Sequence, residues 1–341
     1  MTAVGVVGAS GYLGGELLRL LTGHPEVELA AAVSSRLPGR RVDTAHPNLR
    51  GVTDLAFCAE ADLPELDVLL LAAPHRETMR ILPRLAGRAK VVIDLSGDFR
   101  LADPAVYERY YGVPHEAAEL LGEFVAGCPE LFRDRLRAAD RIAVPGCMAT
   151  AAVLALAPLA EAGVIEPAVD VDARTGSSGS GASAGPQNLH AVRSGAMRVF
   201  ATGGHRHEAE IAALCGLRPR LTATGVEAVR GVQVICRTTL TRDVTESEIR
   251  ALYRDRYAGE PFVRVVAHRR GLYRLPEPKI LLGANFCDVG FALDREHGRV
   301  LAIAALDNLV KGGAGAAVQS MNVRMGWPER RGLEFTGLHP L

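Results

Sequence analysis

The sequence has few aromatic residues, no excess of either charge and no long apolar segment. Aromatic residues make up 5% of the 341 residues, and Lys+Arg and Asp+Glu both number 39. Equal numbers of opposite charges argue against a generally basic nucleic-acid binder, although local basic patches remain compatible with them. No segment approaches the ~18 uninterrupted apolar residues of a membrane span. We therefore expect a protein that binds neither nucleic acid nor a membrane.

The sequence also lacks closely spaced cysteines and a secretion signal. Its six cysteines are far apart and form no C-x-x-C pair, which argues against a zinc ribbon or a redox dithiol. The N-terminus enters the strand-like residues 3–7 directly, without a basic region followed by a cleavable apolar stretch. We expect a cytoplasmic protein in which five of the six thiols are ordinary core residues.

A glycine-rich turn joins the first expected strand to the first expected helix. It contains Gly8, Ser10, Gly11, Tyr12 and Leu13. Glycines let the backbone approach a pyrophosphate, and the N–H groups that open the helix point at it. A glycine fingerprint is a weak signal by itself, but the strand before it and the helix after it favour dinucleotide binding over an ordinary tight turn.

The end of the next expected strand, residues 27–33, indicates which dinucleotide binds. Ser34, Ser35 and Arg36 stand where an NAD enzyme carries a carboxylate for the ribose 2′-hydroxyl. Two hydroxyls and a guanidinium suit a 2′-phosphate instead. The sequence thus predicts NADP(H), the alternative being a solvated loop with an incidental arginine.

The apolar runs at residues 68–73 and 91–96 are typical of parallel strands covered by helices on both faces. Cofactors bind at the carboxyl ends of such strands. Ala73 and Pro74, which end the first of these runs, are therefore expected cofactor contacts.

Length and composition predict an α/β protein with more than one domain. A chain of 341 residues exceeds the size at which single cores usually stop growing. We expect a Rossmann-type doubly wound parallel sheet over residues 1–146 and an α+β catalytic domain over residues 147–305. A C-terminal helix and tail, residues 306–341, should return to the nucleotide domain.

Cys147 follows Pro145 and Gly146 and precedes an apolar run, residues 151–159, that is expected to be helical. Unpaired N–H groups and the positive end of the helix dipole favour a thiolate at such a helix start. This placement can lower a thiol pKa from about 8.5 to roughly 3.5–7.5. We interpret Cys147 as a nucleophile, the alternative being a small core residue before a buried helix.

A glycine- and serine-rich run, residues 176–185, follows another expected strand. Its composition is also typical of a flexible linker. Its position within the catalytic domain favours a substrate or nicotinamide loop instead, with Ser178 and Gly179 as cofactor contacts. Farther along the chain, small residues after Asn308 permit close approach to a ligand, and Asn308 is a candidate to hold the nicotinamide amide.

Histidines and arginines gather after this loop. His205 and His207 are suited to moving protons near neutral pH, and Glu210 lies one helical turn after His207, where it can orient the ring. A metal site would need a third ligand that the sequence does not indicate, so no metal is expected; a surface histidine pair is the other alternative. Arginines match phosphate and carboxylate oxygens, and the candidates for substrate binding are Arg193, Arg198 and Arg206.

Four motifs carry a resemblance that covers nearly the whole chain. They are Gly8-Ala9-Ser10-Gly11-Tyr12, Pro145-Gly146-Cys147, Gly204-His205-Arg206-His207 and Asp307-Asn308-Leu309-Val310-Lys311-Gly312. Together they resemble the N-acetyl-γ-glutamyl-phosphate reductase family, of the aspartate-semialdehyde dehydrogenase superfamily. The resemblance implies that superfamily's fold, a homodimer or homotetramer, and NADP contacts at residues 10–13, 34–36 and Asn308.

Three further segments are most similar to the branch of this family that acts in lysine biosynthesis through α-aminoadipate. They are His46-Pro47-Asn48-Leu49-Arg50-Gly51, Cys147-Met148-Ala149-Thr150 and residues 322–328. That branch reduces an acyl phosphate carried on LysW, a small acidic amino-group carrier protein. Met148 departs from the pattern, since we expect asparagine there in that branch and tyrosine in arginine-pathway enzymes.

The resemblance also implies a mechanism. Cys147 would attack an aminoadipyl 6-phosphate or glutamyl 5-phosphate and expel phosphate, and NADPH would reduce the resulting thioester to the semialdehyde. His207 is the candidate acid/base, oriented by Glu210, and His205 is the second choice. A carrier-bound substrate predicts a basic rim around the pocket. The alternatives are free N-acetylglutamyl phosphate, in arginine biosynthesis, and a non-catalytic NADP-binding regulator.

Overall fold

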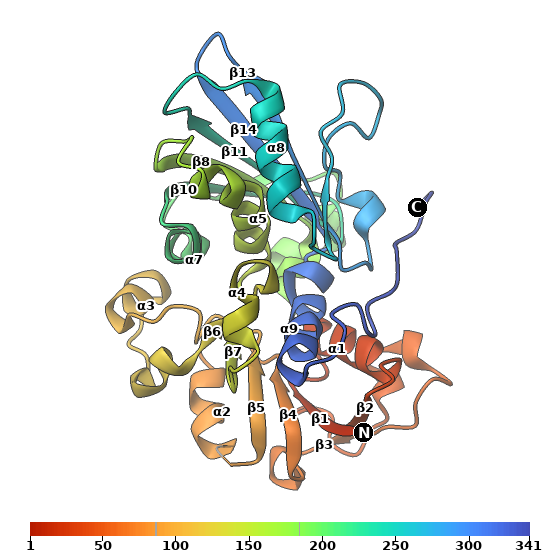
Figure 1. Ribbon diagram of the computed structural model, residues 1–341. Coiled ribbons are helices and arrows are strands. Elements are labelled where there is room, and N and C mark those ends of the chain that lie inside the picture. The colour runs from red at the N-terminus through yellow and green to blue at the C-terminus, as the bar shows by residue number, and fades with distance from the viewer. Residues whose placement is uncertain (86, 184) are drawn as a thin grey trace. The chain divides into compact units, whose positions relative to one another are not determined.

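The structure is a computed structural model that describes residues 1–85, 87–183 and 185–341. The chain divides into two compact units. Unit 1 consists of Met1–Pro145 and Gly313–Glu334, and unit 2 consists of Gly146–Gly312 and Phe335–Leu341. Figure 1 shows the elements of both units, coloured along the chain. The glycine turn therefore lies in unit 1, whereas Cys147 lies at the very start of unit 2.

Unit 1 is built on a parallel sheet with the strand order β3-β2-β1-β4-β5-β7-β6. Its strands are β1 (Thr2–Val7), β2 (Val27–Val33), β3 (Phe57–Cys58), β4 (Leu66–Leu71), β5 (Ala89–Asp94), β6 (Val125–Ala126) and β7 (Arg141–Ala143). The strand order reverses between β1 and β4, so ligands of such a sheet bind at the carboxyl ends of these two strands. The expected Rossmann-type sheet is confirmed.

The helices of unit 1 are α1 (Tyr12–Thr22), α2 (Thr78–Leu85), α3 (Pro104–Tyr111), α4 (Pro129–Leu136) and α9 (Gly315–Met325). Helix α1 begins directly after the glycine turn and buries leucines at helical spacing, including Leu17 and Leu21. Helix α9, from the C-terminal part of the chain, packs against α1 and α4.

Buried polar side chains hold α9 in unit 1. Gln319 Nε2 donates to Glu130 Oε1 of α4 at 3.0 Å, and His24 Nε2 donates to Asn322 Oδ1 at 3.0 Å. Burial lowers the pKa of His24, which favours the neutral ring that this pairing uses. Because buried polar groups are costly unless they are hydrogen-bonded, these contacts fix how α9 lies on the unit.

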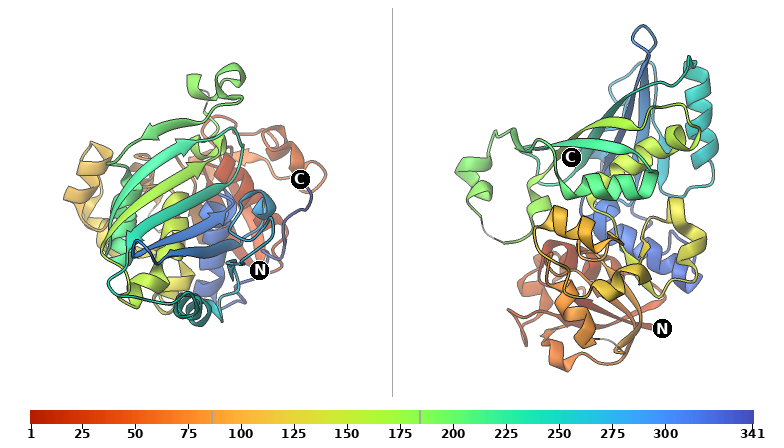
Figure 2. Two further views of the ribbon diagram at one scale, coloured as in Figure 1. Left: turned by 90° about the horizontal axis from the view of Figure 1, so that it is seen from above. Right: turned by 90° about the vertical axis from the view of Figure 1, so that its left-hand side faces the viewer.

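Unit 2 contains a mixed sheet with the strand order β12-β13-β14-β11-β8-β10-β9. Its strands are β8 (Ala168–Thr175), β9 (Arg198–Ala201), β10 (Arg218–Gly225), β11 (Val232–Thr239), β12 (Val263–Val265), β13 (Cys287–Asp294) and β14 (Arg299–Leu306). The pairs β8–β10 and β12–β13 are parallel, and the other pairs are antiparallel. Both views of Figure 2 show α6 and β9, in light green, as an arm at the edge of this sheet.

The helices of unit 2 are α5 (Cys147–Glu161), α6 (His190–Arg193), α7 (Arg206–Cys215) and α8 (Glu246–Tyr257). Helix α5 is buried on all sides from Met148 to Leu159. Pro158 cannot donate a backbone hydrogen bond to Leu154 O, four residues earlier. The hydroxyl of Tyr257 on α8 donates to that carbonyl at 2.6 Å instead, so the interior proline leaves no unsatisfied acceptor.

Several elements differ from the sequence expectation. Strands β9 and β10 were not expected, and β13 begins at Cys287, after Gly283 has turned the chain with φ +79°. The glycine- and serine-rich run begins as an ordered 3-10 turn, Ser177–Ser180, and its Ala184 lies outside the described residues. No helix in the described part of the chain is long and apolar enough to cross a membrane.

Candidate active site

The glycine turn of unit 1 leaves room only for glycine at two positions. Gly8 has φ +75°, and a Cβ there would lie 2.5 Å from Ala72 O. A Cβ at Gly14 would lie 2.4 Å from Gly8 O. The N-cap of α1 is Gly11, with no side-chain cap, so no side chain competes for the N–H groups that open the helix. These features fit a dinucleotide pyrophosphate.

His46 supports this turn. It lies in the segment 46–51, which was named above only because it carries the family resemblance. Its Nε2 donates to Ala9 O at 2.8 Å, and a Cβ at Gly15 would lie 2.5 Å from its ring. His46 therefore fixes the turn and the first residues of α1 together. The pairing spans 37 residues, and no local sequence pattern indicates it.

The residues expected to hold a 2′-phosphate lie beside the glycine turn. Ser10 Oγ is 2.9 Å from Ser34 Oγ, and the Arg36 N–H donates to Ser34 Oγ at 3.3 Å. Ser35, Arg36 and Tyr12 are exposed, and Leu13 is half-buried. Hydroxyls and an exposed guanidinium gathered at this end of β2 fit a phosphate dianion.

The turn also contacts the end of β4, where Ala73 and Pro74 follow the strand. A Cβ at Gly8 would lie 2.9 Å from Ala73 N. Beyond Pro74, Arg76 has φ +73° and is the one non-glycine residue with positive φ among the described residues. Such a conformation is strained for a long side chain.

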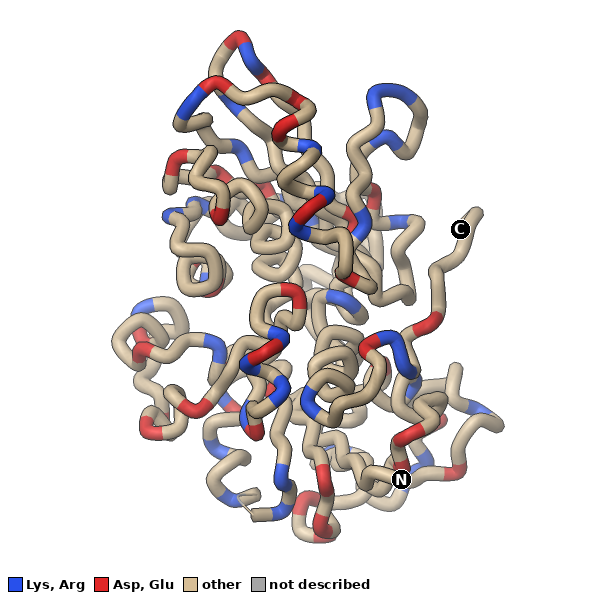
Figure 3. Tube along the Cα trace, viewed as in Figure 1, with Lys and Arg blue, Asp and Glu red and all other residues tan. Residues whose placement is uncertain are grey.

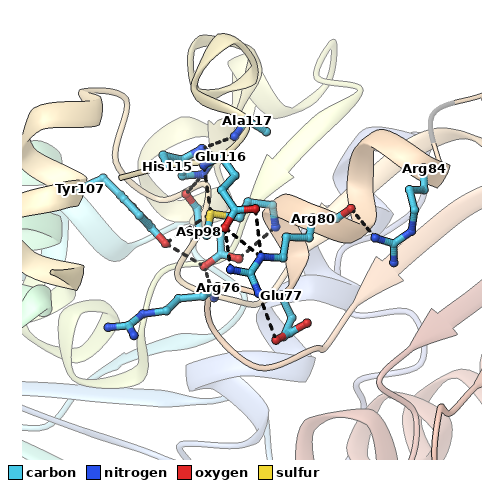
Figure 4. A network of polar contacts seen from close by, with 10 residues as sticks. Arg76, Glu77, Arg80, Arg84, Asp98, Tyr107, His115, Glu116 and Ala117 are labelled. Atoms are coloured by element: carbon cyan, nitrogen blue, oxygen red, sulfur yellow. Dashed lines mark hydrogen bonds and ion pairs between the residues drawn. The ribbon is translucent and has the colours of Figure 1, made fainter. Parts of the chain in front are cut away.

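Asp98, after β5, holds this loop in place. It is fully buried, and Figure 4 shows the polar contacts around it. Its Oδ1 accepts from Arg76 N at 2.7 Å and from the Tyr107 hydroxyl at 3.3 Å, and its Oδ2 accepts from Met79 N at 3.1 Å. Its backbone carbonyl accepts from His115 Nε2 at 2.9 Å. These bonds stabilise the strained backbone at Arg76.

A second buried carboxyl, Asp94, ends β5. It accepts from Ser96 N at 2.9 Å and from Ser96 Oγ at 2.8 Å. Burial, and then the charge of Asp98, raise the pKa of Asp94 to about 7. Near neutral pH this group therefore titrates.

In unit 2, Cys147 is the first residue of α5 and is half-buried. Gly146 is the N-cap, and no side chain caps the helix. Gly312 packs directly on Cys147, because a Cβ at Gly312 would lie 2.5 Å from Cys147 Cβ. The predicted helix start at Cys147 is confirmed, but no pattern in the sequence indicates Gly312 as its neighbour.

The histidine motif lies against the residue that precedes Cys147. A Cβ at Gly146 would lie 2.1 Å from His207 Nε2. Glu210 Oε2 accepts from Gly146 N at 2.7 Å, and Glu210 Oε1 is 3.8 Å from His207 Nε2. Both His207 and Glu210 are buried. Glu210 thus contacts the imidazole and also fixes the peptide that opens α5.

His205 is the N-cap of α7. Its Nδ1 accepts from His207 N at 3.2 Å, and the two rings are 4.5 Å apart and nearly perpendicular. This contact fixes the start of the helix that carries His207 and Glu210. No group of three or more His, Cys, Asp or Glu side chains in the described ranges is arranged to hold a metal ion.

The three candidate substrate arginines lie on three different elements. Arg206 opens α7, next to His207, and is half-buried. Arg193 and Arg198 lie on the arm made by α6 and β9. The Arg193 guanidinium donates to Val226 O, and Arg198 is exposed. Of the three, only Arg206 shares an element with the candidate acid/base.

The two candidate nicotinamide contacts of unit 2 bond to each other. Asn308 Nδ2 donates to Ser178 Oγ at 2.9 Å, and Asn308 Oδ1 accepts from Gly231 N at 2.8 Å. The Asn308 amide thus holds the start of the glycine- and serine-rich loop, where Gly179 is exposed. A direct contact of Asn308 with a cofactor stays a prediction.

The glycine turn of the Rossmann-type unit is typical of a dinucleotide-linked oxidoreductase. In unit 2, the cysteine at a helix start beside a histidine–glutamate pair is a candidate nucleophile. Residues 3–139 match the semialdehyde dehydrogenase NAD binding domain. Residues 147–308 match the semialdehyde dehydrogenase dimerisation domain. The chain belongs to the semialdehyde dehydrogenase family.

Relatives of known name match over the full length of the chain. A protein from Deinococcus radiodurans named LysW-L-2-aminoadipate 6-phosphate reductase is 46% identical over 99% of this chain and 98% of its own. A protein from Thermomicrobium roseum, provisionally given the same name, is 48% identical over 100% of both chains. The predicted family is therefore confirmed.

Solved structures share the fold. Aspartate semialdehyde dehydrogenase II from Vibrio cholerae matches with a TM-score of 0.72 at 17% identity, covering 96% of this chain and 98% of that one. The Candida albicans enzyme with NADP matches with a TM-score of 0.68 at 15% identity, covering 95% and 98%. The expected α/β fold and a phosphorylating oxidoreductase are confirmed, and the matched NAD-binding domain agrees with the expected NADP(H).

Proposed function

We propose that the protein reduces an aminoadipyl 6-phosphate, or a glutamyl 5-phosphate, carried on a LysW-like protein. The products are the semialdehyde and phosphate, and NADPH is the reductant, in lysine or arginine biosynthesis. The observation that carries the proposal is the placement of Cys147 at the uncapped start of α5, beside His207 and Glu210. Full-length relatives at 46% and 48% identity whose names specify this substrate support it.

Cys147 is the nucleophile in this proposal. Its Sγ bonds to the acyl carbon while the C–O bond to phosphate breaks, which gives a thioester and inorganic phosphate. Bound NADPH supplies the hydride that reduces the thioester. The carbonyl of the aldehyde then re-forms, the C–S bond breaks and Cys147 is released as the thiolate. The positive end of the α5 dipole stabilises that anion.

His207 is the general acid/base in this proposal. Its Nε2 faces Gly146, next to the nucleophile, so it can take the Cys147 proton and return one to the oxygen that gains charge. Glu210 stabilises the protonated ring at 3.8 Å, and His205, capping the same helix, is the second candidate. Arg206, Arg193 and Arg198 are the candidate ligands for phosphate or for a substrate carboxylate.

NADP(H) is held by unit 1 in this proposal. The glycine turn at Gly8 and Gly11 receives the pyrophosphate, while Ser34, Ser35 and Arg36 receive the 2′-phosphate. The absence of a carboxylate from this loop, residues 34–36, supports NADP(H) over NAD(H).

An exposed basic loop in unit 2, residues 268–274, is the candidate surface for an acidic carrier. Figure 3 shows its arginines, and Arg270 and Arg274 have no acidic partner within the described ranges. Arg269 is 3.8 Å from Glu246, which already pairs with Arg250 at 2.9 Å. This excess of positive charge would steer an acidic protein.

The test is the reverse reaction, phosphate-dependent reduction of NADP+. Two aldehydes are compared, aminoadipate semialdehyde on its carrier protein and free N-acetylglutamate semialdehyde. Turnover with the carrier-bound aldehyde only is the expected result. Turnover with the free acetylated aldehyde would assign the protein to arginine synthesis instead, and turnover with neither would contradict the proposed substrate class.

A further inference from the structure

The turn through residues 307–312, at the end of the first segment of unit 2, packs on the candidate nucleophile. Gly312 N donates to Asp307 O at 2.9 Å, which closes the turn. A Cβ at Gly312 would lie 2.5 Å from Cys147 Cβ and 3.0 Å from Cys147 Cα. Real Cβ atoms do not approach other atoms so closely, because protein interiors are close-packed. The backbone of this turn therefore forms one wall of the space that Cys147 occupies.

A fully buried carboxylate fixes the turn. Asp307 has an exposed fraction of 0%. Its Oδ1 accepts from Leu309 N at 2.8 Å and from Val310 N at 3.3 Å. Its Oδ2 accepts from Gly283 N at 2.7 Å and from Arg230 Nη1 at 3.3 Å. A buried carboxylate persists only when its oxygens are paired, and these four donors pair both of them.

Asn308, the residue after Asp307, connects this turn to the glycine- and serine-rich loop. Asn308 accepts from Gly231 N and donates to Ser178 Oγ. Gly231 O in turn accepts from Gly176 N at 3.0 Å, and Val229 O accepts from Ser178 N at 2.9 Å. Asp307 and Asn308 thus join the turn at Gly312 to the loop that begins at Gly176.

The partners of Asp307 distinguish it from an ordinary structural ion pair. Asp288 is also a buried aspartate paired with an arginine, Arg264, at 2.6 Å. That pair joins the neighbouring strands β12 and β13. The donors to Asp307 instead come from loops and from the start of a π-helix, Val310–Ala314, whose Gly312 packs directly on Cys147. Its hydrogen bonds therefore hold irregular backbone in place.

We propose that Asp307 is a positioning residue for Cys147. Its carboxylate fixes the turn through residues 309–312 and so sets where the Cys147 side chain lies at the start of α5. It acts through Gly312 and does not contact substrate. This inference rests on the proposed function only in taking Cys147 as the nucleophile.

The test is Asp307→Asn. Asparagine keeps one oxygen for Leu309 N and Val310 N but replaces the acceptor of Gly283 N and Arg230 with an NH₂ donor. The rate at which iodoacetamide alkylates Cys147 is measured by mass spectrometry between about pH 5 and pH 10, the range in which thiols titrate. We expect alkylation to slow about tenfold, or its pH midpoint to move by about half a unit or more. We expect kcat to fall about tenfold to a hundredfold with KM for NADPH little changed, because small misplacements of a reacting group are costly.

Three further variants show whether the effect is specific to the contact with Cys147. Gly312→Ala should give the same signature as Asp307→Asn, because its Cβ meets Cys147 directly, whereas Gly259→Ala should not, because nothing lies within 4 Å of a Cβ there. Asp288→Asn removes an equally buried charge and should lower thermal stability without changing the alkylation profile of Cys147.

Wild-type alkylation and turnover in Asp307→Asn would overturn the inference, as would equal losses in Asp307→Asn and Asp288→Asn. If Asp307→Asn does not fold, wild-type alkylation and turnover in Gly312→Ala would overturn it. Failure of the proposed function gives a different result, namely full turnover by Cys147→Ser.

Discussion

At the scale of single residues, the carboxylate of Glu210 connects the candidate acid/base to the backbone beside Cys147. Glu210 carries a charge that a buried position tolerates only with partners. It contacts His207 with one oxygen and receives the Gly146 N–H with the other. One carboxylate therefore connects the candidate acid/base to the peptide that precedes Cys147.

Replacing Cys147 with serine should lower turnover about a thousandfold or more, because a hydroxyl is a far weaker nucleophile than a thiolate at neutral pH. Steady-state NADPH oxidation measures the effect. The matched control is Cys215→Ser, at the far end of α7, which should keep wild-type turnover. Turnover by Cys147→Ser close to that of the control would exclude covalent catalysis at this position.

Asp94 predicts a pH dependence of stability. Burial raises its folded-state pKa from the ordinary 3.8 to about 7, so between these values the folded protein binds the proton more tightly than the unfolded chain. The free energy of unfolding should then fall as pH rises through this window and level off above it. Asp94→Asn should flatten this slope in urea titrations at several pH values, and an unchanged slope would contradict the assignment.

At the scale of elements, the candidate cofactor contacts of unit 1 lie on short segments that follow strands. The loop after β2 and the glycine turn before α1 meet through Ser10 and Ser34. The loop after β4 is held by Asp98 in a conformation that its sequence would not favour. Regular strands and helices thus serve as fixed supports for irregular loops that carry the candidate ligand contacts.

Arg36→Asp should reverse the preference between the two dinucleotides. A carboxylate repels the 2′-phosphate and accepts from a 2′-hydroxyl, so we expect KM for NADPH to rise about tenfold or more and KM for NADH to fall. Steady-state kinetics with both cofactors test this. Arg40→Asp is the control, an exposed arginine farther along the same loop. An equal effect in both variants would indicate general electrostatics and not a 2′-phosphate site.

At the scale of the whole molecule, charge is balanced in number but not in position. Lys+Arg and Asp+Glu are equal at 39, yet the exposed basic loop, residues 268–274, contains three arginines and no acidic residue. Clusters of this kind affect association rates more than folding stability.

Reversing two charges of this loop, Arg270→Glu with Arg274→Glu, should lower kcat/KM for a carrier-bound substrate about tenfold or more. The loss should shrink at high salt, because screening weakens steering. Arg242→Glu with Arg254→Glu, two exposed arginines elsewhere in unit 2, is the control and should change kcat/KM far less. A similar loss in both double variants would remove the basic loop as the docking surface.

Much of the fold could be predicted because its signals are local. Helix α8, for example, has a local start signal, a capping box between Thr245 and Glu248. Strand β10 was missed because Arg218-Pro219-Arg220 hides the alternation of buried residues. Strand β9 was missed because it is an exposed edge strand with no buried residue.

The sequence by itself determined the kinds of chemistry present. They are a glycine turn, two serines and an arginine after β2, a cysteine at a helix start and a histidine–glutamate pair one turn apart. Each depends on residues within a few positions of one another. Only the tertiary structure decided their partners. Glu210 reaches Gly146 across 64 residues and Asn308 reaches Ser178 across 130, and such pairings follow from sheet order and core packing, which no local pattern encodes.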